Sequence, residues 1–278
     1  MSAAGVEVLD ASRDRDHNRS VVTAVGAPTA IERALVGAAG LALERIDLRH
    51  HRGVHPRVGA LDVAPVIPLG DTPREVAIDT AQRVGQGISQ LGIPVWWYGW
   101  MSSPPGRSLP SLRHGGFEAL QAGWGVDRPS ADLPEDCRQP HVSAGITCVG
   151  ARALLLAWNV DVDGISVEAL RPIAAGLRES GGGFEGLRTL ALALEEQGRV
   201  QLSMNLEDVE RRDVAAIFDA IEARVSAAGG RIASTEVIGM LPDALVLSVA
   251  AGRLKLSDAN PERLLSRRLV RHLAHRAP

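Results

Sequence analysis

The pattern of apolar and polar residues along the chain predicts strands and helices that alternate. Short apolar runs bounded by turn residues predict strands at residues 6–10, 21–25, 60–68, 95–98, 199–205 and 231–239. Longer segments with helical periodicity predict helices at residues 29–46, 72–92, 166–180, 186–197 and 214–228. Residues 147–160 fit either a helix or a strand. This alternation is typical of α/β proteins, and it predicts two α/β subdomains, each a sheet covered by helices.

Two helix starts have a side-chain pattern that suits the first turn of a helix. Thr29 and Glu32 form a capping box, and so do Thr72 and Glu75. Pro73 then occupies the first helical position, where its missing N–H group costs nothing.

Two segments are predicted to be loops. Residues 10–18 are polar, and residues 100–136 are rich in Gly, Pro, Ser and Arg with weak periodicity. A loop as long as the second one is usually functional or mobile. Its aromatic side chains either form a wall for a flat ligand or anchor the loop to the body of the protein.

Composition narrows the class of protein. With 278 residues the chain is long enough for one large domain or two smaller ones, and a net charge of −3 argues against a nucleic-acid partner. The two cysteines, Cys137 and Cys148, have no metal-binding spacing, so a reduced cytoplasmic location is the simplest interpretation. The absence of a long apolar run predicts no membrane partner.

The segment from residue 46 to residue 68 carries the candidate chemistry. It joins three histidines to an apolar run interrupted only by Asp62. A loop that leads directly into a buried strand is held rigidly, which suits a catalytic site. Within it, Pro56 restricts the backbone of His55 to extended conformations, so the imidazole points in a defined direction. The ordinary pKa of a histidine, about 6.5, suits proton transfer near neutrality.

The same segment resembles the signature of the glutamate formimidoyltransferase family. The residues that carry the resemblance are His50, His51, Gly53, His55, Pro56, Arg57, Gly59, Ala60 and Asp62. Further similar segments follow in the same order along the chain, at residues 16–20, 93–99, 107–110, 144–152, 201–205 and 236–242, together with Asn159. The resemblance therefore covers essentially the whole chain.

The resemblance implies two related subdomains, residues 1–150 and 151–278, with mixed sheets and a ligand tunnel between them. It implies transfer of a formimidoyl group from N-formimidoyl-L-glutamate to N5 of tetrahydrofolate, a reaction of histidine degradation and one-carbon metabolism. Tetrahydrofolate is then a co-substrate, no metal is needed, and a cytoplasmic homodimer is expected. An interdomain cleft is a common place for small ligands.

The catalytic residues that the resemblance implies are His55 and Asp62. His55 would remove a proton from the incoming nitrogen and return it to the leaving nitrogen. Asp62 has two roles that the sequence leaves open. Its carboxylate could stabilise the positively charged amidinium, or it could orient His50 or His55 by accepting a ring hydrogen bond.

The substrates suggest the remaining site residues. Both substrates are anionic, so Arg19 and Arg57 are candidates for binding carboxylates, with Asn18 beside them; a plain surface ion pair is the alternative for each arginine. Glycine-containing segments at roughly residues 136–145 and 182–191 align with the family's folate-contacting parts and suggest contacts to the pterin, although glycines there could simply make turns. The candidate folate-binding residues are Ser143, Gly145, Thr147, Gly182 and Gly186.

A metal-binding site is the alternative interpretation of the histidine-rich segment. His51 and His55 are four residues apart with Asp62 nearby, but Gly53 and Pro56 break the helix that would bring both rings to one face. The sequence therefore favours proton transfer over metal chemistry.

Three departures from the family pattern leave a second function open. The family has a strand–helix segment ahead of the part that matches Val6, and its absence would leave a neighbouring strand with unpaired backbone groups. Val54 stands where the family has an acidic residue that would raise the pKa of the catalytic histidine, and Trp100 replaces a usual glutamate. The alternative function is a folate-binding or regulatory paralogue with little turnover.

Overall fold

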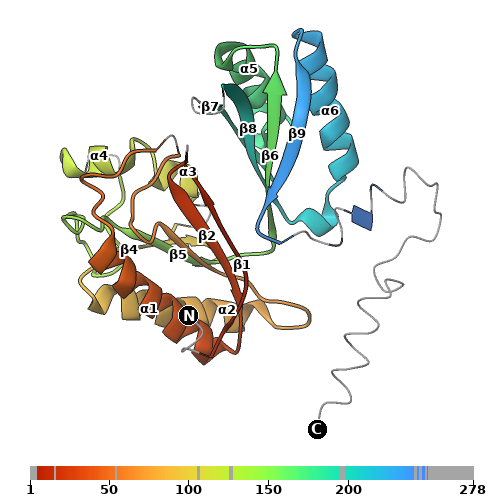
Figure 1. Cartoon of the computed structure of the whole chain (residues 1–278). Helices are drawn as coiled ribbons and strands as arrows, with labels where there is room; N and C mark the ends of the chain where they lie inside the picture. Colours follow the sequence, from red (N-terminus) through yellow and green to blue (C-terminus); the bar gives the residue numbers. More distant parts are fainter. Residues whose placement is uncertain are drawn as a thin grey trace. The chain divides into compact units, whose positions relative to one another are not determined.

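The computed structural model describes residues 5–15, 17–53, 55–104, 107–124, 128–194 and 198–240, together with Asp243, Val246, Leu247 and Val249. The chain divides into two compact units, residues 1–153 and 154–278 (Figure 1). Both are α/β units with helices on their sheets, which confirms the predicted fold class.

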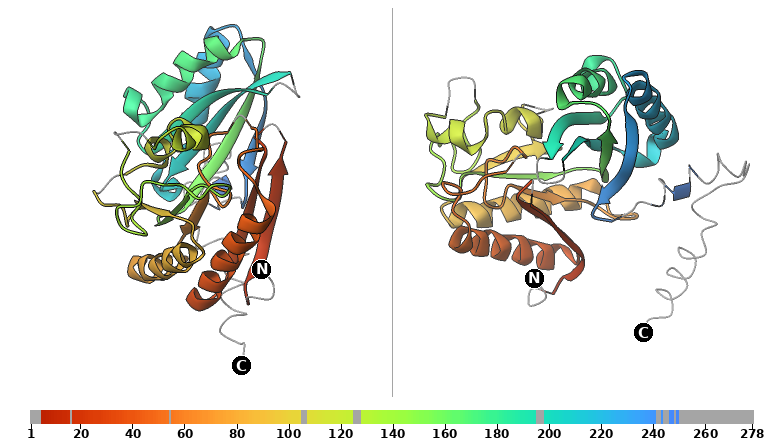
Figure 2. Two further views of the ribbon diagram at one scale, coloured as in Figure 1. Left: turned by 90° about the vertical axis from the view of Figure 1, so that its left-hand side faces the viewer. Right: turned by 45° about the horizontal axis from the view of Figure 1, so that its top comes forward.

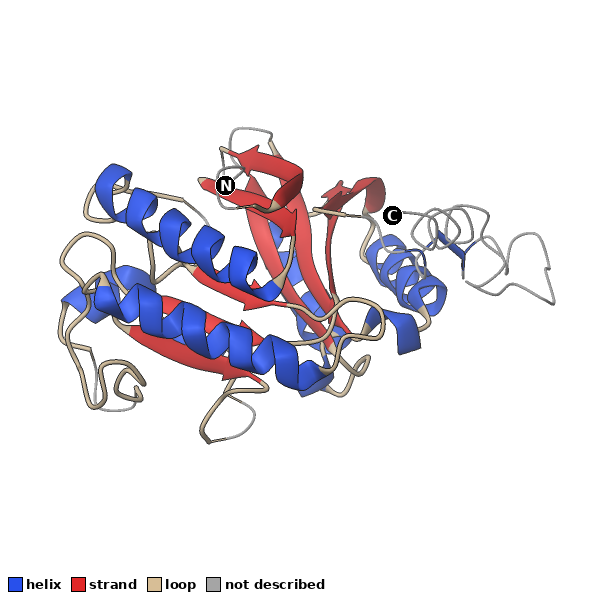
Figure 3. Ribbon diagram, turned by 90° about the horizontal axis from the view of Figure 1, so that it is seen from below, coloured by secondary structure: helices blue, strands red, loops and turns tan. Residues whose placement is uncertain are grey.

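The first unit is built around a parallel three-stranded sheet with the strand order β3-β5-β4. Its strands are β3 (Val63–Val66), β4 (Val95–Gly99) and β5 (Thr147–Ala151). The helices α1 (Pro28–Arg45) and α2 (Arg74–Gln90) lie side by side over one face of it (Figure 3). Buried alanines and valines, such as Ala81 and Val149, form the core between them because small side chains let helix and sheet approach closely.

A hairpin forms a second sheet in the same unit. β1 (Glu7–Asp14) pairs antiparallel with β2 (Arg19–Val25), and Val6 packs against Ala30 and Ala34 of α1. The prediction of a loop over residues 10–18 is therefore wrong for residues 10–14. Their polar side chains do not prevent strand formation, because pairing with β2 satisfies the backbone groups and the side chains are exposed or only half-buried.

The described residues of the segment 100–136 pack on the other face of the sheet. It contains two short helices, α3 (Leu109–Leu112) and α4 (Gly116–Gln121). Trp124 is buried and meets Trp96 of β4 edge to face with ring centroids 5.2 Å apart, and both indole N–H groups donate to the carbonyl of Pro129. Trp124 thus anchors the segment to the body, whereas Trp100, just beyond β4, is 40% exposed.

The second unit has an antiparallel four-stranded sheet with the order β7-β8-β6-β9 (Figure 2). The strands are β6 (Leu155–Asp163), β7 (Leu187–Leu194), β8 (Arg199–Glu207) and β9 (Arg231–Ile238). The helices α5 (Val167–Leu177), which contains Pro172, and α6 (Val214–Ala227) cover one face. Single-turn 3₁₀ helices, Glu179–Gly181 and Val209–Arg211, complete the unit.

Further local predictions are wrong. Residues 187–194 form a strand rather than part of a helix over residues 186–197. The leucines there fit both periodicities, and the ladder with β8 overrides their helix propensity. Thr29 and Thr72 do not cap their helices: α1 begins at Pro28 and α2 follows Pro73, and neither N-cap residue makes a side-chain hydrogen bond. The fixed φ of proline, rather than a capping oxygen, sets each start.

The strand predicted at residues 60–68 is confirmed only over Val63–Val66. Among the helices that the structure describes, none combines the length and the apolar character that crossing a membrane requires.

Candidate functional site

His51 ties the histidine-rich loop to its neighbours. Its Nε2–H donates to the Asn18 carbonyl at 2.7 Å, and its Nδ1 accepts from Arg57 Nε at 3.0 Å. A carbonyl can only accept and a guanidinium can only donate, so this pair of contacts fixes the neutral Nε2–H tautomer. Both ring nitrogens of His51 are therefore used in holding the loop, which argues against His51 as a metal ligand.

The loop lies directly on the turn between β1 and β2. Asn18 adopts a positive φ of 46° and donates from its side chain to the Arg52 carbonyl at 2.5 Å. Gly53 passes so close that a Cβ there would lie 2.5 Å from the His17 carbonyl oxygen. Asn18, predicted to bind substrate, thus positions the loop that carries His55. Val54, the departure from the family pattern, lies outside the described residues.

On its other side the loop joins the start of β5. Ile146 N donates to the Val58 carbonyl at 2.9 Å, and Gly59 forms a bridge with Gly145, whose φ is +70°. Leu48 N donates to the Ser143 carbonyl at 2.8 Å. Thr147 begins β5 and is fully buried. Three of the candidate folate residues, Ser143, Gly145 and Thr147, therefore lie beside the loop of His55.

His55 is half-buried and has one defined tautomer. Its Nδ1 lies 2.9 Å from the Pro56 carbonyl oxygen, which can only accept, so Nδ1 carries the hydrogen and Nε2 keeps its lone pair. Burial, together with the positive charges of Arg19, Arg113 and His17, lowers the pKa of His55 to about 3. At neutral pH the ring is thus an uncharged base with Nε2 unprotonated.

The carboxylate of Asp62 stabilises the loop by binding the backbone of the loop. Its Oδ1 accepts from Val58 N at 2.8 Å and Gly59 N at 3.2 Å, and its Oδ2 accepts from Arg113, which follows α3. Across the part of the chain that the structure describes, no hydrogen bond joins Asp62 to His50 or His55. Its carboxylate instead holds Arg113, whose charge acts on His55.

The two candidate arginines differ in their surroundings. Arg57 is 12% exposed and donates to both carboxylate oxygens of Glu118 in α4, at 2.7 and 2.9 Å, and to the His51 carbonyl. Arg57 would have to leave Glu118 to bind a substrate carboxylate in the same geometry. Arg19 begins β2 and acts electrostatically on both His55 and Asp14. Arg19 is therefore the candidate arginine whose charge reaches the proposed base.

A cavity of about 550 Å³ lies in the first unit, within the range of small-molecule sites. Trp97, Arg107, Asp132 and Arg138 are among the residues that line it. Arg107 and Asp132 are both largely buried and form an ion pair at 2.5 Å, and Asp132 also accepts from Trp97 N at 2.8 Å. The segment of residues 136–145, expected to contact folate, begins at this cavity.

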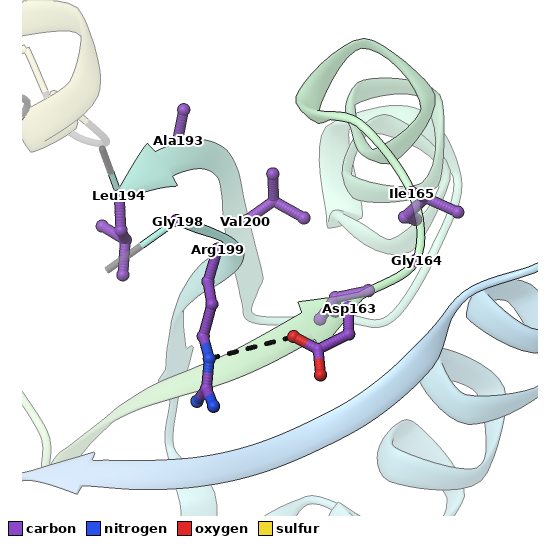
Figure 4. A pocket seen from close by; sticks show the side chains of 9 residues that line it. Asp163, Gly164, Ile165, Ala193, Leu194, Gly198, Arg199 and Val200 are labelled. Atoms are coloured by element: carbon purple, nitrogen blue, oxygen red, sulfur yellow. Dashed lines mark ion pairs between the residues drawn. The ribbon is translucent and has the colours of Figure 1, made fainter. Parts of the chain in front are cut away.

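The other candidate folate residues lie in the second unit. Gly182 and Gly186 have φ of +79° and +74° in the connection between α5 and β7, which is what a turn requires of them. A smaller cavity of about 290 Å³ lies elsewhere in this unit, where Asp163 faces Arg199 at 3.8 Å (Figure 4). Asp163 also pairs with Arg231 at 2.5 Å, and Arg199 faces a second carboxylate, Asp161, at 3.8 Å, so two carboxylates compensate two guanidinium groups here.

Comparison with protein families decides the relationship. Residues 1–152 match the model of the formiminotransferase domain, N-terminal subdomain, and residues 157–260 match that of the formiminotransferase domain. The chain belongs to the formiminotransferase family. The resemblance carried by the histidine-rich segment is thereby confirmed.

Relatives with assigned names are similar to this chain over most of its length. A glutamate formimidoyltransferase of Streptococcus pyogenes is 34% identical over 264 residues, covering 92% of this chain and 86% of that protein. A glutamate formimidoyltransferase of Thermoplasma acidophilum is 32% identical, with 95% and 88% covered. A formimidoyltransferase-cyclodeaminase of Sus scrofa is 34% identical, and the match covers 89% of this chain and 47% of the longer relative.

Sequence reasoning missed two residues close to His55. Arg113 reaches Asp62 across 51 positions of sequence, which no local pattern signals. His17 lies with its ring centroid 6.0 Å from that of His55. The only available signal for His17 was its place in the matched segment of residues 16–20.

Proposed function

We propose that this formiminotransferase transfers a formimidoyl group from N-formimidoyl-L-glutamate to N5 of tetrahydrofolate. Membership of the family and relatives named for this reaction support the activity. One observation in this chain carries the proposed role of His55: a neutral imidazole whose Nδ1–H is bound to a carbonyl and whose Nε2 is left as a base.

The proposed reaction needs one proton to move between two nitrogens. N5 of tetrahydrofolate attacks the amidinium carbon while Nε2 of His55 takes the N5 proton. In the tetrahedral adduct that follows, the bond from the same carbon to the glutamate nitrogen breaks, and His55 gives its proton to that nitrogen. His55 ends neutral, and charge and atoms balance. A histidine in this role contributes roughly 10²–10⁴-fold to the rate.

The charges around His55 suit this cycle. Without substrate, Arg19 and Arg113 disfavour the imidazolium form. A substrate carboxylate bound near Arg19 would offset that charge and raise the pKa of His55 toward neutrality. His55 would then hold the proton during the lifetime of the adduct, so substrate binding itself would prepare the acid step.

The test is the transfer assay on the parent, His55→Ala and His50→Gln. His50 lies on the same loop with its side chain 83% exposed, so His50→Gln is the matched control. We expect His55→Ala to lower kcat about a hundredfold or more while folate affinity, measured by calorimetry, stays within a few-fold. Equal turnover of His55→Ala and the parent would remove His55 from the mechanism. Folate binding without transfer by the parent would favour the paralogue.

The homodimer, the cytoplasmic location and the ligand tunnel that the resemblance implies stay predictions.

A further inference from the structure

His17 is a buried histidine that the proposed reaction does not use. Its side chain is only 2% exposed. Its Nδ1 lies 2.8 Å from Asp14 Oδ1, and its backbone N donates to the same oxygen at 2.7 Å. Partial burial would raise the pKa of Asp14, but these two contacts with His17 lower it below its usual value, so the carboxylate is ionised. Nδ1 of His17 therefore carries a hydrogen, and in the neutral form of the ring Nε2 carries the lone pair.

The Nε2 atom of His17 has no hydrogen-bond partner among the described residues, although it is buried. Leaving a buried polar atom unpaired is costly, and in native structures such an atom calls for an explanation. The ring of His55 lies with its centroid 6.0 Å away, at an angle of 48°. Each ring donates through Nδ1, to Asp14 and to Pro56 respectively, so in their neutral forms both keep an unprotonated Nε2.

Three contacts hold together the two segments that carry the rings. Asn18 donates to the Arg52 carbonyl, His51 donates to the Asn18 carbonyl, and Gly53 packs against the His17 carbonyl. These contacts join the turn that carries His17 to the loop that carries His55. The contacts hold the two segments together, and the hydrogen bonds to Asp14 and Pro56 orient the two rings.

We infer that His17, supported by Asp14, is a positioning residue for His55: it takes a proton that enters the pair before His55 does, and so keeps Nε2 of His55 free as the base. The Asp14 carboxylate stabilises positive charge on the His17 ring. On His55 the surrounding charges act the other way. Among the residues that the structure describes, the charged or titratable groups around the pair are Asp14 and Arg19 on the hairpin, His51 on the loop, and Arg113 with its partner Asp62.

This inference rests on the proposed role of His55, but its test does not require turnover. In histidine-labelled protein without substrates, long-range ¹H–¹⁵N spectra report the tautomer and charge of each ring; His17→Gln and His55→Gln assign the signals. In the parent between pH 4 and 8, we expect His17 to take up the first proton while His55 stays neutral with Nδ1–H. In His17→Gln, the titration of His55 should move up by about one to two pH units, the effect of removing a charge about 6 Å away.

His50→Gln should leave the His55 titration unchanged. A His55 titration that is the same in His17→Gln and the parent would overturn the inference. If His17→Gln does not fold, the parent spectra alone decide, because protonation of His55 ahead of His17 overturns it equally. In the transfer assay, the acid limb of the pH profile of kcat/KM should move to higher pH in His17→Gln. A purely structural role of His17 would not produce this shift. If the parent shows the expected titration of His17 and His55 but transfers no formimidoyl group, the proposed function is contradicted and the inference about His17 stands.

Discussion

Gly145 and Gly182 offer a matched pair of substitutions that tests how the loop of His55 is held. Both have positive φ, +70° and +79°, and both were candidate folate contacts. They differ in their surroundings. A Cβ on Gly145 would lie 2.0 Å from the Val58 carbonyl oxygen, whereas a Cβ on Gly182 would meet nothing within 4 Å. Replacement by alanine therefore applies the same backbone strain at both positions and a steric clash at only one.

The expected costs follow from these two differences. An alanine at positive φ costs roughly 1–2 kcal/mol, and this is the whole effect expected for Gly182→Ala. In Gly145→Ala the Val58 carbonyl must also move about 1 Å, since real Cβ contacts are essentially never closer than 3.0 Å. That movement breaks the 2.9 Å hydrogen bond from Ile146 N, worth about 1 kcal/mol. We expect Gly145→Ala to cost about 2–3 kcal/mol in total.

The same movement should reach the catalytic histidine, because Val58 is three residues from His55. A misplacement of about 1 Å can lower a rate about a hundredfold. Urea unfolding of both variants measures the stability, and formimidoyl transfer measures the rate. Gly182→Ala should keep kcat near that of the parent, while Gly145→Ala should lose most of it. Equal kcat in the two variants would refute the view that the Val58–Gly145 contact positions His55. A weakened folate affinity in Gly182→Ala would support Gly182 as a folate contact.

Two further predictions concern charge. The pKa of His55 is about 3 in the folded chain and about 6.5 when unfolded, so between these values only the unfolded chain binds the proton, and stability falls on acidification. Between pH 6.5 and pH 4.5 the free energy of unfolding, measured with urea, should fall by about 2–3 kcal/mol more for the parent than for His55→Gln. An equal fall in both proteins would contradict the lowered pKa of His55. Glu118→Gln should cost about 0.5–1 kcal/mol, since Glu118 is 55% exposed, and should leave KM for the donor within about twofold. A KM several-fold lower would instead show that Arg57, once released, binds a substrate carboxylate.

The sequence predicted the elements wherever one periodicity was unambiguous. The helix at 214–228 and the strands at 21–25, 95–98 and 231–239 agree with α6, β2, β4 and β9 to within about two residues. The prediction failed for residues 187–194, because the leucines of this segment suit a helix and a half-buried strand equally. Only the partner strand β8, which follows later in the chain, decides between them.

The sequence likewise predicted only part of the candidate site. The restriction that Pro56 places on His55 is local, so the sequence could indicate a fixed imidazole in advance. What the fixed imidazole does depends on charges from elsewhere in the chain. Arg19 and Arg113 act on it from the hairpin and from beyond α3, and neither distance can be read from spacing. Arg57 shows the opposite case, since its place in the motif suggested substrate binding while its donors contact Glu118 and His51.

These contacts give the histidine-rich segment two separate tasks. His51, Arg57 and Asp62 use their hydrogen bonds to hold the loop and its neighbours. Within the described part of the chain, His55 forms one hydrogen bond, to Pro56, and Nε2 is left without a partner. A base must be rigid yet unpaired at the atom that takes the proton, and these demands conflict within one side chain because hydrogen bonds are what make it rigid. The segment resolves the conflict by placing the rigidity in the residues around His55. Substitutions in these residues should therefore act on kcat through the position of His55, even though none of them touches the transferred proton.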